Sequence, residues 1–169
     1  TGLTAAFGAQ TTESAVFTDE SLDAYALNAA YTADSYGVSV TYAVVETSST
    51  NEDTYTAFNA YYLPEGSNLP SISVGYEIGD LGGEAATADE KTSFMVGLSW
   101  DEVGPGSAGI ALGHSSTVEG SDEEYQYEAY YSYPINDGMT ITPLIYSKDS
   151  ATSGQDDTTG VMVKTSFSF

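Results

Sequence analysis

The chain has 169 residues, no cysteine and a formal net charge of −22, because 25 acidic residues face only three lysines. This length suits one domain, expected to span residues 1–169, and the lack of cysteine excludes disulfides and thiolate chemistry. The charge argues against nucleic-acid binding, which needs a basic surface. Disorder fits poorly, because the chain carries 14 Tyr and 6 Phe, which favour strands.

Alternation of apolar and polar residues runs along almost the whole chain and predicts an all-β protein. The chain has no run of about 18 apolar residues, which a transmembrane helix would need. In chain order, we expect ten strands at residues 3–9, 25–33, 36–46, 55–63, 71–78, 92–100, 108–114, 125–133, 139–147 and 160–169. Several approach the roughly 9–11 residues that a tilted strand needs to cross a bilayer, although the first and seventh look short.

The connections between these strands alternate between two kinds. One kind is short or rich in turn residues, at 34–35, 64–70, 101–107 and 136–138. The other kind is longer and holds most of the carboxylates, at 10–23, 47–54, 80–91, 115–124 and 148–159. Short turns at one end and long loops at the other are typical of outer-membrane barrels, with both termini on the periplasmic side when the strand number is even.

Each strand divides into an apolar and a small polar face. In the last strand, Val163 and Phe167 share one face, whereas Lys164 and Ser166 share the other. A membrane strand needs this pattern because lipid touches one side and water the other. A soluble sheet over a core would alternate in the same way, but its outer face would carry more charge. We therefore predict an antiparallel transmembrane β-barrel.

Aromatic residues near the strand ends are candidates for the interfacial girdles of such a barrel. They are Tyr25, Tyr36, Tyr55, Tyr61, Tyr62, Trp100, Tyr125, Tyr133 and Phe169. A terminal Phe after alternating apolar residues resembles the signal by which bacterial barrels are recognised for insertion. We therefore expect Phe169 to be the true C-terminus. Thr1 is expected to follow a processing site or to lie within a longer chain.

The small polar face predicts the lining of a pore. The candidate pore-lining residues are Glu77, Glu128, Lys164, Gln126 and Ser99, of which the charged ones could tune ion selectivity or simply sit in water. A closed barrel of ten strands would be narrow and packed. So many small residues suit a wider, water-filled barrel with further strands upstream of Thr1.

Catalytic and metal chemistry find little support in the sequence. His114 is the single histidine, so neither a His-based metal site nor a triad can be built within one chain. The acidic stretches 122–124 and 156–157 could attract divalent cations, but neither has the spacing of a calcium loop. We expect no cofactor, no metal and no enzymatic activity.

Several stretches resemble a known family: residues 71–77, 93–100, 109–114, 127–135 and 139–143, together with the Phe-ending tail. They look like the C-terminal barrel of cyanobacterial outer-membrane porins of the carbohydrate-selective porin family. The resemblance covers roughly residues 55–169 well and the first fifty loosely. It implies passive diffusion of small solutes and inorganic ions, iron included, through a barrel that is often trimeric. The family's N-terminal cell-wall anchor and coiled coil have no counterpart in residues 1–169.

The leading hypothesis is therefore a porin of the cell outer membrane, with lipid, lipopolysaccharide, small solutes and cations as partners and a homotrimer as the assembly. Three alternatives stay open: a small closed barrel with a structural or adhesive role for its acidic loops, a secreted β-sandwich, and an outer-membrane barrel enzyme. Solubility without detergent would favour the sandwich. A plugged lumen would favour the adhesive barrel.

Overall fold

The computed structural model describes residues 1–12, 22–66, 68–83, 89–150, 152 and 154–168. These residues form ten strands and no helix. The strands are β1 (Gly2–Thr11), β2 (Asp23–Thr32), β3 (Tyr36–Glu46), β4 (Glu52–Tyr62), β5 (Ser71–Asp80), β6 (Glu90–Val103), β7 (Gly106–Val118), β8 (Tyr125–Asn136), β9 (Met139–Lys148) and β10 (Thr158–Phe167).

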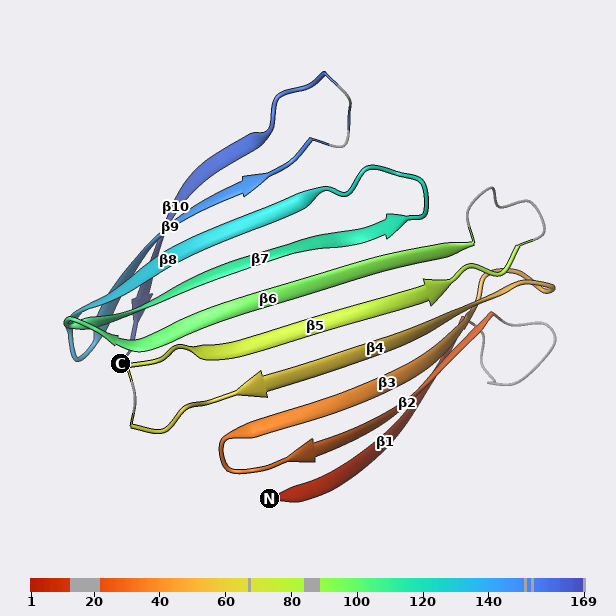
Figure 1. The fold of residues 1–169 in the computed structure, drawn as a ribbon, viewed down its shortest axis with the longest axis horizontal. Helices are drawn as coiled ribbons and strands as arrows, with labels where there is room; N and C mark the ends of the chain where they lie inside the picture. Colours follow the sequence, from red (N-terminus) through yellow and green to blue (C-terminus); the bar gives the residue numbers. More distant parts are fainter. Residues whose placement is uncertain (13–21, 67, 84–88, 151, 153, 169) are drawn as a thin grey trace.

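The strands form one up-and-down sheet in which each strand pairs antiparallel with the next, in the order β1 to β10. Figure 1 shows this sheet as a single curved and twisted layer, with β1 and β10 at its two edges. The prediction of an all-β antiparallel chain with about ten strands is confirmed. Closure into a barrel is not seen, because β1 and β10 each pair with one strand only in the described part of the chain.

Most of the strands are longer than the sequence pattern indicates, although β3 matches its predicted bounds and β10 has its predicted length. The first and seventh, expected to be short, are Gly2–Thr11 and Gly106–Val118. At their loop ends the ladder continues through polar residues, and Glu119 N donates to Glu90 O at 2.8 Å just beyond β7. Backbone pairing of this kind needs no apolar side chain, so alternation alone underestimates the strand length.

The strand ends that lead into the five acidic connections all lie at one end of the sheet, and those that lead into the four turns lie at the other (Figure 1). The contrast in length is weaker than expected, since the acidic connection 47–51 is shorter than the turn segment 63–70. The turn between β6 and β7 consists of Gly104 and Pro105. Gly104 has a φ of 64°, and the fixed negative φ of Pro105 then makes this a type II′ hairpin turn.

The sheet has almost no protein core. Val44, 4 % exposed, is the buried hydrophobic residue of the described chain, while Phe58 is 51 % and Val163 61 % exposed. No second layer of described residues covers either face (Figure 1). A water-soluble domain normally buries the apolar face of a sheet against another layer, and no layer of described residues does so here. The described residues also contain no helix long and apolar enough to cross a membrane.

Candidate pore-lining face

The register between strands sorts the side chains into two continuous faces, because residues directly opposite in an antiparallel pair point the same way. One row runs from Tyr31 through Val38 and Ala60 to Val74. The row continues through Val96, Leu112 and Tyr127 to Ser147 on β9. We call this side the apolar face; it also carries Leu3, Phe7, Leu27, Val40, Tyr42, Phe58, Ile72, Tyr76, Phe94, Leu98, Ile110, Leu112, Tyr127, Ile145, Val161 and Phe167.

The apolar face carries no charged side chain between the ends of the ten strands. The acidic residues that share its parity, such as Asp23, Asp80 and Glu90, stand at the loop ends of their strands. An uncharged stripe therefore crosses the whole width of the sheet, and its large side chains are mostly exposed.

The aromatic residues predicted as girdles divide between the two faces. Six of them lie on the apolar face near strand ends: Tyr25, Tyr36, Tyr62, Trp100, Tyr125 and Tyr133. The prediction is wrong for Tyr55 and Tyr61, because each pairs with a glycine of the opposite, polar face. Phe169 lies outside the described residues.

The second side, here called the polar face, carries all five candidate pore-lining residues. Ser99 lies between Ser71 and Gly109, and Glu77 lies opposite Ser93. The other three stand at Gln126 and Glu128 on β8 and at Lys164 on β10, opposite Thr142. The face is otherwise built mainly from Ser, Gly, Thr and Ala. The sequence therefore predicted correctly that these five residues share one face of the sheet. That they line a pore stays a prediction.

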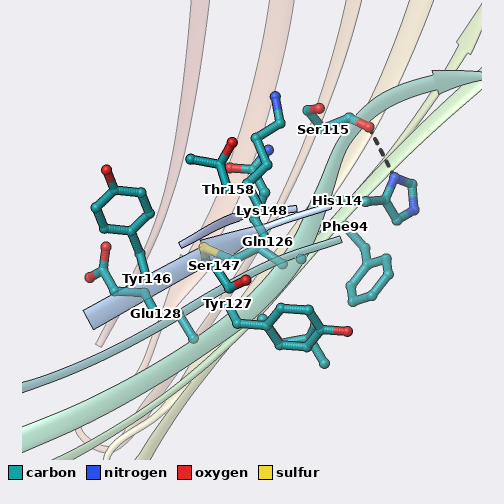
Figure 2. Close-up of a pocket in the computed structure, with 14 residues that line it drawn as sticks. Phe94, His114, Ser115, Gln126, Tyr127, Glu128, Tyr146, Ser147, Lys148 and Thr158 are labelled. Atoms are coloured by element: carbon teal, nitrogen blue, oxygen red, sulfur yellow. Dashed lines mark hydrogen bonds between the residues drawn. The ribbon is translucent and has the colours of Figure 1, made fainter. Parts of the chain in front are cut away.

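Only two of the five candidates come together. Gln126 and Glu128 border a hollow of about 570 Å³ that is also lined by Tyr146 and Lys148 (Figure 2). In Figure 2, Glu128, Tyr146 and Lys148 stand on one side of the strands, and Tyr127 lies on the other. Glu77, Ser99 and Lys164 do not line this hollow.

Two lysines of the polar face were missed by the sequence analysis, which left them in loops. Lys91 is in β6 opposite Gly79, with its Nζ 4.7 Å from the centre of the Tyr55 ring. Lys148 is in β9 opposite Gln126, and its Nζ lies 3.3 Å from Oε2 of Glu124. All three lysines thus share the polar face. The face of Lys91 could have been predicted from the sequence, because Lys91 is two residues from Ser93 and residues two apart in a strand point to the same face.

The acidic side chains at the loop end help to hold the backbone there. Glu46 accepts a hydrogen bond from Asp23 N at 3.0 Å, and Asp53 accepts one from Gly82 N at 3.1 Å. Asp149 and Asp157 accept similar bonds from Tyr125 N and Ser150 N. Glu123 accepts a hydrogen bond from the Tyr125 hydroxyl. Among the described residues, no three His, Asp or Glu side chains gather as a metal site would require.

His114 lines the same hollow and also belongs to an aromatic cluster. It is 6 % exposed, with Nδ1 3.0 Å from Ser115 O. Its ring meets Phe94 edge-on at 4.8 Å between centroids and Tyr125 at 5.9 Å. These three residues form one row of the apolar face at the loop end. The histidine therefore completes a band of rings there.

Comparison of the chain with models of protein families, with curated proteins and with solved structures finds no match.

Proposed function

We propose that this chain forms all or part of the wall of an outer-membrane β-barrel that acts as a porin, through which inorganic ions and small hydrophilic solutes diffuse passively. The observation that carries the proposal is the register. Across all nine strand pairs it keeps most of the large apolar side chains on one face, which carries no charge between the strand ends and which no described residue covers. Hydrocarbon is the surrounding that such a face suits, since water would meet a very large apolar patch.

The dimensions of the apolar face support the proposal. On β8, Tyr125 lies near the loop end and Tyr133 near the turn end. Eight residues at about 3.3 Å each separate them by roughly 26 Å along the strand. The apolar band of outer-membrane barrels is about 25 Å tall between its two aromatic girdles, although the tilt of a strand shortens the vertical span.

The polar face supports an aqueous interior. On β5, the small residues Ser71, Ser73 and Gly75 are less exposed than Ile72 and Val74. Smaller side chains that are nevertheless better covered are expected on the inside of a curved sheet, where neighbours converge. A wall of small polar groups leaves room for water, and the acidic mouth would concentrate cations and repel anions.

The free edges of the sheet must be paired in a membrane, because hydrocarbon offers no hydrogen bonds to backbone groups. The proposal therefore requires that β1 and β10 pair with each other or with strands outside the described chain. The resemblance to carbohydrate-selective porins adds sugars to the candidate solutes, a homotrimer as the assembly, and outer-membrane lipid and lipopolysaccharide as surroundings.

Reconstitution tests this function. The purified protein is refolded in detergent, added to a planar bilayer and recorded in potassium chloride, and we expect discrete conductance steps. Insertion without conductance would refute the pore and favour a structural or adhesive barrel. A protein that stays soluble and folded without detergent would refute the membrane barrel, since two copies could then pack their apolar faces as a sandwich.

A further inference from the structure

The polar face contains four tyrosines, and each is directly opposite a glycine of the neighbouring strand. The pairs are Tyr61 with Gly37, Tyr55 with Gly79, Tyr130 with Gly109 and Tyr146 with Gly160. These four are the only aromatic side chains among the described strand residues of the polar face. The other pairs of directly opposite residues on the polar face consist mostly of Ser, Thr, Ala or Gly.

Each ring lies over its glycine. A Cβ added to Gly109 would come 2.5 Å from Cε1 of Tyr130, and one added to Gly79 would come 2.8 Å from Cε1 of Tyr55. Carbon atoms in contact are about 3.5–4.0 Å apart, so the ring occupies the place of the missing side chain. Gly37, Gly79 and Gly109 are buried, although the sheet has no second layer. The rings themselves cover these glycines.

The position of Tyr55 is fixed further from two sides. Its hydroxyl donates to Oδ2 of Asp53 at 3.0 Å, and the Lys91 ammonium lies over its ring, 4.7 Å from the centroid. The ring is therefore held between Gly79 and Lys91. A glycine beneath each ring lets a bulky side chain lie along the sheet instead of standing out from it.

We infer that the four glycine–tyrosine pairs set the free cross-section of the water path, by keeping the rings against the wall of the pore. This inference rests on the porin function proposed above. A side chain on the glycine forces the ring off the sheet, and the open side of the polar face is where it can go. The glycines are thus determinants of conductance, although they carry no functional group.

The test compares Gly37→Ala and Gly109→Ala with the control Gly8→Ala. Gly8 also lies on the polar face, opposite Ala26, but an added Cβ there meets nothing within 4 Å. Hydroxyl-radical footprinting with mass spectrometry measures the exposure of Tyr61 and Tyr130, and planar bilayers measure single-channel conductance. We expect greater ring reactivity and lower conductance in the two variants, and neither change in the control.

Two converse variants keep the test decisive if the alanine variants fail to fold. Tyr61→Ala and Tyr130→Ala remove the ring without any clash, and each should raise the conductance. If the wild type conducts and all four variants conduct equally well, the inference about the glycine–tyrosine pairs is overturned but the proposed porin function is not. Unchanged reactivity of the rings in folded Gly→Ala variants would also overturn it. A wild type that never conducts would instead refute the proposed porin function.

Discussion

Replacing Val96 by lysine should destabilise the protein strongly in a bilayer. Val96 is in the middle of β6, on the apolar face, between Val74 and Leu112, and is 37 % exposed. A lysine at the midplane on the lipid side of a barrel costs about 2–4 kcal/mol. That cost lowers the equilibrium constant for folding by roughly thirty-fold to several-hundred-fold, at 1.4 kcal/mol for each factor of ten.

The neighbouring residue provides a matched control. Met95 is also apolar and 47 % exposed, but it lies on the polar face between Gly75 and Gly113. Met95→Lys keeps the length of the side chain and adds the same charge on the opposite side of the same strand, so we expect a cost below about 1 kcal/mol. Val96→Met controls for the change of size at the apolar position.

The assay is equilibrium unfolding by guanidinium chloride in lipid vesicles, followed by the fluorescence of Trp100, the single tryptophan. The free energy of unfolding comes from linear extrapolation of each curve. Equal losses in Val96→Lys and Met95→Lys would refute the reasoning, because the two faces would then meet the same surroundings. A Val96→Lys variant as stable as the wild type would refute it as well.

Three further predictions concern the girdle, the ions and the turn. Trp100 fluorescence should be quenched more by lipids brominated near the headgroup than by lipids brominated near the chain end, and the reverse order would contradict its place in a girdle. Glu128→Gln should lower the preference for K⁺ over Cl⁻ and Lys164→Gln should raise it, and both changes should be smaller in concentrated salt. The measurement is the reversal potential in a KCl gradient, and unchanged values would show that these residues do not line the water path. Gly104→Ala should cost about 1–2 kcal/mol in the same unfolding assay, because φ there is 64°. If Gly104→Ala and Gly8→Ala lowered the free energy of unfolding equally, the positive φ at residue 104 would not be the cause of the loss.

Much of the sheet could be predicted from the sequence because alternation is a local property. The face of each residue in β3, for example, follows from Val38 and Val40 alternating with Ser39 and Thr41, and its bounds Tyr36–Glu46 match the prediction. The ends of other strands could not be predicted, because threonine, serine and acidic residues extend the backbone ladder without an apolar pattern. Closure is not local either, since it depends on what the two edges meet.

The candidate site was predicted in part for the same reason. Parity placed Glu77 and Glu128 on the polar face, but not the pairing of Tyr61 with Gly37. The two rings of the doublet Tyr61 and Tyr62 do not by themselves indicate which one faces the polar side. The register decides it, because Tyr62 pairs with Tyr36 and Tyr61 with Gly37. Such cross-strand pairs become visible only when the strands are aligned.

The central claim is that the apolar face meets hydrocarbon, and a cysteine scan tests it most directly. The chain has no cysteine, so single substitutions at residues 71–75 of β5 introduce one thiol at a time. In lipid vesicles, a charged, water-soluble thiol reagent should label the positions of Ser71, Ser73 and Gly75 and spare those of Ile72 and Val74. Equal labelling of both sets would contradict the account.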